Sequence, residues 1–105
     1  GENDQDIVSA INEVIRQQGG LSVSENGSVS SLALNIAGIM TTRSCGEVAV
    51  DYLDLSNRVK ALGCSMAAPF MTLSFMALLV IPELKLSDSG LFDVRIFRNT
   101  ELFLD

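Results

Sequence analysis

Apolar residues recur at helical spacing in the first twenty residues, GENDQDIVSAINEVIRQQGG. Successive members of this set lie three or four residues apart, so they share one face of an α-helix. They are Ile7, Ile11, Val14 and Ile15. Asn3 or Asp4 can cap the helix, and the glycines at 19 and 20 can end it. We predict an N-terminal helix whose apolar stripe faces a core.

The next segment, LSVSENGSVSSLALNIAG, alternates apolar and polar residues around Asn26-Gly27. Both residues of this dipeptide tolerate positive φ, so it favours a two-residue hairpin turn. A strict turn pairs Ser24 with Val29 and places Val29 on the face opposite Leu21 and Val23. The face opposite Val29 then carries Ser28, Ser30, Leu32, Leu34 and Ile36. Two alternatives remain: a bulge shifts the register, or both faces of the hairpin are covered.

A second helix is predicted in TTRSCGEVAVDYLDLSNRVKALGC. Ser44 and Glu47 have the spacing of a capping box, in which each side chain satisfies a free amide of the first turn. Gly63 can supply the left-handed stop. The apolar positions follow at steps of four and three, and we expect them to pack on a sheet or on the first helix. They are Val48, Tyr52, Leu55, Val59 and Leu62.

Residues 69–90, PFMTLSFMALLVIPELKLSDSG, are nearly all apolar until a polar turn. Pro69 can be the first position of a short helix that runs through Ala77, although the alternation of Thr72 and Ser74 with apolar residues also suits a strand. We favour the helix. We then expect an extended segment over 80–86, a turn at 87–90 and a strand within 94–104. The predicted fold class is α+β: two layers, a mixed or mostly antiparallel sheet, and helices on one face.

Composition and net charge indicate the class of protein and disfavour some partners. The chain of 105 residues is 48% hydrophobic and has a net charge of −6, which suits one globular domain over 1–105 and disfavours nucleic acid as a partner. Its longest apolar run is about half of what a membrane helix needs, so we expect a soluble, cytoplasmic protein with no membrane partner and no targeting segment. Cys45 and Cys64 are expected to be free, buried thiols.

The chain contains no histidine, so it lacks the residue on which many catalytic arrangements depend. It therefore has no Ser-His-Asp triad and no imidazole metal ligand, and we predict no catalytic or metal-binding residue in it. Two local features have a functional reading. Arg43 at a helix start can hold an anion, although ordinary capping explains it as well. A mixed apolar and hydroxyl set can form one wall of a pocket for a flat heterocycle, although core packing is the simpler explanation: Met71, Thr72, Ser74 and Phe75.

Several blocks resemble one known family in sequence and in order. They are GENDQDIVSAINEVIRQQGG, LNIAGIMT, a helix that ends in KALGC, and PFMTLSFMALLVIPELKLSDSGLFDV. The last block mixes residues that core patterning alone would not impose, and it is similar to the C-terminal domain of bacterial adenine deaminases. Leu79 departs from that family, which usually has proline there. The family also has a strand just before the glycine that matches Gly1, so the chain looks like a domain without its first strand.

The resemblance implies a parent enzyme of the amidohydrolase superfamily that hydrolyses adenine to hypoxanthine and ammonia. It implies a divalent metal, manganese or iron, held by histidines of a catalytic barrel and not by this chain. The implied partner is that barrel in the same polypeptide, together with a homo-oligomer contact. The expected role is that of an accessory piece whose apolar segment packs on the barrel or at a subunit contact. The alternative is an independent oligomerisation or partner-binding module.

Overall fold

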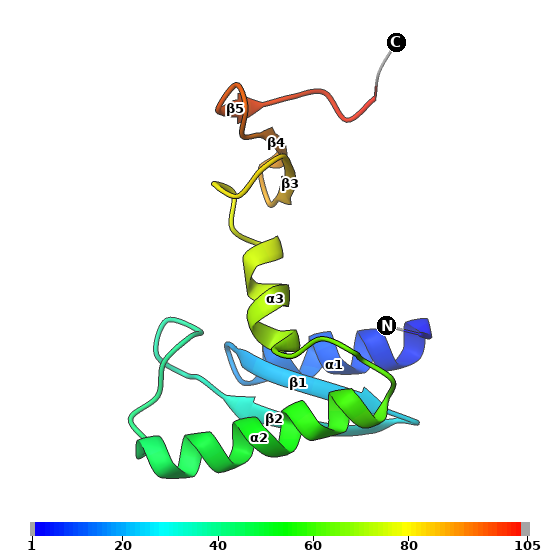
Figure 1. The fold of residues 1–105 in the computed structure, drawn as a ribbon, viewed down its shortest axis with the longest axis vertical. Coiled ribbons are helices and arrows are strands. Elements are labelled where there is room, and N and C mark those ends of the chain that lie inside the picture. The colour runs from blue at the N-terminus through cyan, green and yellow to red at the C-terminus, as the bar shows by residue number, and fades with distance from the viewer. Residues whose placement is uncertain (1, 104–105) are drawn as a thin grey trace. The chain divides into compact units, whose positions relative to one another are not determined.

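The computed structural model describes residues 2–103, and these form two compact units, residues 2–65 and residues 66–103 (Figure 1). The first unit contains helix α1 (Asp4–Arg16), strands β1 (Gly20–Glu25) and β2 (Ser28–Ala33), and helix α2 (Cys45–Ala61). The second contains helix α3 (Pro69–Met76) and strands β3 (Leu84–Ser87), β4 (Gly90–Asp93) and β5 (Arg98–Asn99). No helix among residues 2–103 has the length and apolar character to cross a membrane.

Both predicted helices of the first unit begin where their caps are. Asn3 caps α1, and its side-chain oxygen accepts a hydrogen bond from the amide of Asp6 at 2.8 Å. Ser44 caps α2 in a complete capping box with Glu47. Gly63, with φ of 97°, follows the last turn of α2 as the left-handed residue. The local capping signals therefore set these ends, as predicted.

The hairpin has a strict two-residue turn with no bulge. Ser24 pairs with Val29 and Leu21 pairs with Leu32, while Asn26 and Gly27 have φ of 51° and 79°. Of the two alternatives, the structure therefore has the unshifted register. Because side chains alternate across a strand, this register gives the hairpin one serine-rich face and one apolar face.

The two helices cover the two faces. Serines of the first face bond to α1: Ser22 Oγ donates to the carbonyl of Ala10 at 2.7 Å, and Ser24 Oγ donates to Asp6 Oδ1 at 2.6 Å. Helix α2 contacts the same strands and lies on the opposite side of the hairpin from α1 (Figure 1). The buried apolar core of the described residues is made of Val23, Leu32 and Leu55.

The α+β class and the antiparallel pairing are confirmed, whereas the arrangement of layers differs from the prediction. The described strands form two sheets, of two and three strands, and not one. Helices cover both faces of the hairpin and not one face, because each face makes a different kind of contact with a helix. The serine face hydrogen-bonds to α1, and the apolar face packs with α2.

The apolar stripe of α1 is not buried as predicted. Ile11 and Ile15 are 52% and 66% exposed, and α1 faces the hairpin with polar groups. The periodicity located the stripe correctly, but helical spacing alone does not show what the stripe meets.

A glycine contact fixes the chain that links the hairpin to α2. The amide of Gly20 donates to the carbonyl of Gly38 at 3.0 Å. Gly19 has φ of +125°, and a Cβ built on it would lie 2.1 Å from Cα of Gly38. Only glycine allows this approach. A bridge between Ile36 and Met40 then closes a tight turn that presents Ile39 and Met40.

The second unit follows the predicted order of elements. Helix α3 confirms the helical alternative and ends at Met76, although Leu79 replaces the family's usual proline. Most of the expected extended segment over 80–86 is irregular, and β3 begins only at Leu84. Strands β3 and β4 flank the expected turn as a hairpin, so β4 is an unpredicted strand. Within 94–104 the strand is the short β5, and residue 104 lies outside the described residues.

Candidate functional site

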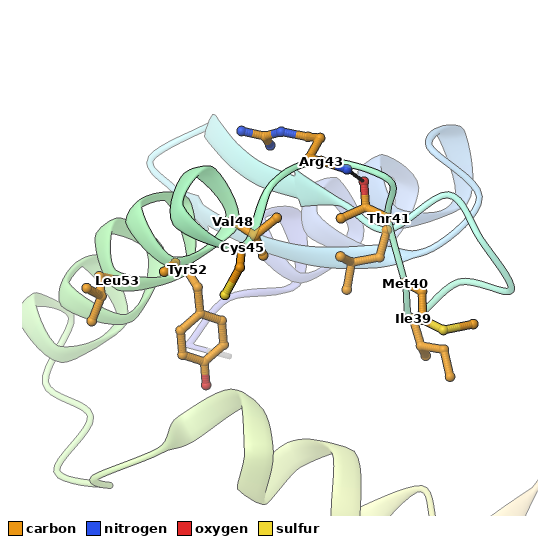
Figure 2. A pocket seen from close by; sticks show the side chains of 10 residues that line it. Ile39, Met40, Thr41, Arg43, Cys45, Val48, Tyr52 and Leu53 are labelled. Atoms are coloured by element: carbon orange, nitrogen blue, oxygen red, sulfur yellow. Dashed lines mark hydrogen bonds between the residues drawn. The ribbon is translucent and has the colours of Figure 1, made fainter.

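An apolar hollow of about 700 Å³ lies in the first unit, between α2 and the turn that follows β2 (Figure 2). One side comes from α2 and the other from the turn, whose conformation the Gly19 and Gly38 contact holds. We call this site the α2 hollow. It is lined by Leu34, Ile39, Met40, Thr41, Arg43, Cys45, Val48, Ala49, Tyr52 and Leu53.

The lining of the α2 hollow is suited to apolar groups. Ile39 and Leu53 are 73% and 60% exposed although both are large aliphatic side chains. Arg43 is paired within the unit: its amide donates to Thr41 Oγ1 at 3.4 Å, shown dashed in Figure 2. The hollow can therefore accept apolar side chains of another surface, and its lining shows no acid and base pair for catalysis.

The predicted anion site at the start of α2 is occupied by the protein's own groups. Arg43 Nη1 lies 2.6 Å from Asp51 Oδ2. Glu47 Oε2 accepts from both the amide and the hydroxyl of Ser44, at 3.0 and 2.6 Å. These bonds, with the Ser44 hydroxyl first, lower the pKa of Glu47. The contacts match ordinary capping, which was the simpler explanation of this segment.

Both cysteines are free, as expected, but they are not buried. Cys45 is exposed in the lining of the α2 hollow, and Cys64 is half-buried. Cys45 is the first residue of α2 and is exposed there, so burial was the wrong expectation for it.

The four predicted pocket-wall residues all lie on α3. Met71 and Phe75 are 54% and 49% exposed. The hydroxyls of Thr72 and Ser74 donate to α3's own backbone, to the carbonyls of Ala68 at 3.0 Å and Met71 at 2.7 Å. The structure thus brings Met71, Thr72, Ser74 and Phe75 onto one short helix, with both hydroxyl protons engaged.

Helix α3, with sequence PFMTLSFM, has apolar residues on all its sides, and the hydroxyls of its two polar residues, Thr72 and Ser74, bond to its own backbone. A helix of this kind is normally buried on all sides, yet Leu73 and Met76 are also largely exposed. Such a helix needs a surrounding surface to remove it from water.

The ionised groups with the largest shifts serve structure. Asp6 accepts from the Ser24 hydroxyl, from Asn3 and from the amides of the hairpin turn, and its pKa is lowered to about 2. Arg16, followed by Ser31, lowers the pKa of Glu13 to about 2.

In the second unit Arg95 lowers the pKa of Asp93, to which it donates at 2.7 and 3.0 Å.

Across residues 2–103, no group of three His, Cys, Asp or Glu side chains is placed to hold a metal ion. A metal centre therefore does not fit this chain's described residues.

The α2 hollow was not predicted from the sequence. Ile39 and Met40 are its most distinctive residues, and they lie in the segment IAGIM, which belongs to no periodic element. The available signal was an apolar turn between a hairpin and a helix, where polar residues are usual.

Comparison with known proteins identifies the family. Residues 1–98 match the family described as "Adenine deaminase C-terminal domain". The chain therefore belongs to this family of C-terminal domains.

Relatives named "Adenine deaminase" match nearly the whole chain. One from Methanosarcina barkeri is 50% identical over 98% of the chain, and one from Salinibacter ruber is 47% identical over 100% of it. One from Sulfurovum is 50% identical over 92%. The chain spans 19%, 19% and 18% of the lengths of these relatives. No solved structure matches the chain.

Proposed function

We propose that the chain works as the accessory C-terminal part of an adenine deaminase, which hydrolyses adenine to hypoxanthine and ammonia in purine metabolism. The observation that carries this proposal is the match over residues 1–98 to a C-terminal domain family, joined to relatives of which the chain spans 19%. The isolated chain would have no activity, since it has no histidine and no cluster of metal ligands in its described residues.

The remaining part of the polypeptide would hold the divalent metal, manganese or iron, that activates water for attack on the ring. This chain supplies no ligand to it in our proposal. Its own contribution is apolar surface that packs against the catalytic part, with α3 as the first candidate because it has apolar residues on all its sides. The two free thiols suit a reducing cytoplasm, which we propose as the compartment.

A finer proposal concerns substrate. Met71, Thr72, Ser74 and Phe75 would add a wall to the purine pocket if α3 reaches it. The hydroxyl protons of Thr72 and Ser74 are already donated to backbone carbonyls, so neither side chain has a proton left to donate to a purine. A wall role would then depend on contact between Phe75 and the flat ring and on the hydroxyl oxygens as acceptors.

Two substitutions in the complete polypeptide separate packing from substrate contact. Phe75→Ala should lower the melting temperature and leave kcat and KM for adenine unchanged if α3 only packs. Met76→Ala is the matched control, because Met76 lies on the same helix, is 65% exposed and is not among the four candidates. A raised KM with an unchanged melting temperature for Phe75→Ala alone would instead support the pocket wall. Unchanged kinetics and stability in both variants would refute both roles.

The homo-oligomer contact also remains a proposal. The molecular mass of the complete polypeptide, measured by light scattering over a range of concentrations, tests it. A mass that stays at one subunit throughout would reject it.

A further inference from the structure

Helix α1 carries four of its five large aliphatic side chains on the side turned away from the hairpin; the fifth, Val14, is half-buried. Ile7, Val8, Ile11 and Ile15 are 36%, 53%, 52% and 66% exposed. Ile7, Ile11 and Ile15 follow at steps of four, so they form a continuous ridge along the helix. We call these four residues the aliphatic face of α1.

The side of α1 that meets the hairpin is held by hydrogen bonds, beside the half-buried Val14. Asp6, Ala10 and Glu13 follow at steps of four and three and accept from hairpin serines at 2.6 to 2.9 Å. Asp6 Oδ1 also accepts from the amide of Gly27 at 3.0 Å. The polar side of this amphipathic helix therefore points to its own unit.

This orientation is the reverse of the usual one. A surface helix of an independent domain turns its apolar stripe to the core and its polar side to water. In α1 the hydrogen bonds to the hairpin fix the opposite orientation, so the aliphatic face is presented as a ridge for another surface.

We propose that the aliphatic face of α1 is the surface on which the part of the polypeptide that precedes this domain in its relatives docks. The inference rests on the proposed function, that the chain is the C-terminal part of such a polypeptide. It assigns α1 a place between two surfaces, with the hairpin on its polar side and the preceding part on its aliphatic side.

The position of α1 favours this occupant. In the relatives most of the polypeptide lies outside this C-terminal domain, so it precedes α1. Asn3 caps α1, and Ile7 follows one turn later. A preceding part joined here would be held close to the aliphatic face, where tethering gives a high effective concentration. A second copy would have no such tether, so it is the less favoured occupant of this face.

Thiol labelling of the complete polypeptide tests whether the face is covered. Ile11→Cys should react with a maleimide at least about tenfold more slowly than the matched control Asn12→Cys, because a covered thiol reacts only after local opening. Asn12 is exposed in the same helix and outside the aliphatic face. Peptide mass spectrometry separates both from Cys45 and Cys64. Ile15→Cys repeats the test if Ile11→Cys fails to fold. Equal rates for the two positions would overturn the proposal.

Two further measurements identify the occupant. Protection should persist after roughly hundredfold dilution, whereas protection by a second copy would be lost by mass action. A photocrosslinking residue at position 15, in a mixture of ¹⁵N-labelled and unlabelled polypeptide, should crosslink to the preceding part of its own chain. Crosslinks to residues 66–103, or between labelled and unlabelled copies, would overturn the proposal.

These readouts do not depend on adenine hydrolysis. A protected Ile11→Cys in a polypeptide that releases no ammonia from adenine would refute the proposed function and leave the docking intact. Rapid labelling in a polypeptide that does release ammonia would refute the docking alone.

Discussion

Asp6 Oδ1 accepts a hydrogen bond from Ser24 Oγ at 2.6 Å, although the two residues lie 18 positions apart in the chain. The same carboxylate accepts from the amides of Asn26 and Gly27 at the hairpin turn. One side chain in the first turn of α1 thus fixes the helix to the far end of the hairpin. This contact, and the one between Glu13 and Ser31, decides which side of α1 remains exposed.

We predict that acid loosens α1 from the hairpin. The hydrogen bonds lower the pKa of Asp6 from 3.8 to about 2, and that of Glu13 from 4.5 to about 2. A lowered pKa in the folded state stabilises the fold above the unfolded value, and this contribution is lost as pH falls toward about 2. Hydrogen exchange of the α1 amides at a series of pH values measures it.

Two variants make this acid prediction specific. Asp6→Asn should destabilise the α1 contact at neutral pH and weaken its dependence on acid, because the charged acceptor is gone. Asp4→Asn is the control, since Asp4 lies in the same turn but is not among the groups that accept from the hairpin. An acid response identical in Asp6→Asn and the unmodified chain would contradict the assignment.

The core of the first unit should be sensitive to truncation. Leu32 is 2% exposed, so Leu32→Ala should lower the free energy of unfolding of residues 2–65 by roughly 2–5 kcal/mol. Leu62→Ala makes the same chemical change at a side chain that is 46% exposed, and should stay within about 0.5 kcal/mol. Hydrogen exchange of the hairpin amides provides the free energies. Equal losses in both variants would mean that Leu32 is not central to the core.

Local signals in the sequence were enough to predict the starts of α1 and α2, the end of α2, the turn at Asn26-Gly27 and the helix at Pro69. Each of these features depends on residues at most four positions apart, whose preferred conformation is set by nearby backbone groups. The end of α1 was predicted at Gly19 and Gly20, but the helix ends at Arg16, and Gln18 with φ of 60° is its left-handed residue. Periodicity could not predict the side to which α1 turns its isoleucines, because serine to carboxylate bonds over 18 residues leave no periodic signal. The layer order was missed for the same reason.

The candidate sites show the same division. Capping explained the start of α2 because Ser44 and Glu47 are three residues apart. The α2 hollow could not be predicted, because it depends on a turn held by Gly19 against Gly38, which are distant in sequence. The four residues on α3 were placed on one helix correctly, and their contact with substrate stays a prediction.

The glycine contact behind the hollow provides another prediction. Gly19→Ala should destabilise the first unit by at least roughly 1–2 kcal/mol, because alanine disfavours positive φ and its Cβ would meet Gly38. Gly46→Ala is the matched control: a Cβ there meets nothing within 4 Å, and alanine favours helix by up to about 1 kcal/mol. Thermal unfolding followed by circular dichroism compares them. A Gly19→Ala chain as stable as Gly46→Ala would contradict the described turn.

We propose that this chain supports an adenine deaminase without carrying out its chemistry. Ammonia release from adenine, measured for the purified chain and for the complete polypeptide with added manganese or iron, decides whether this division of roles holds. We predict release by the complete polypeptide and none by the chain alone. Sustained ammonia release by the 105-residue chain would contradict the account.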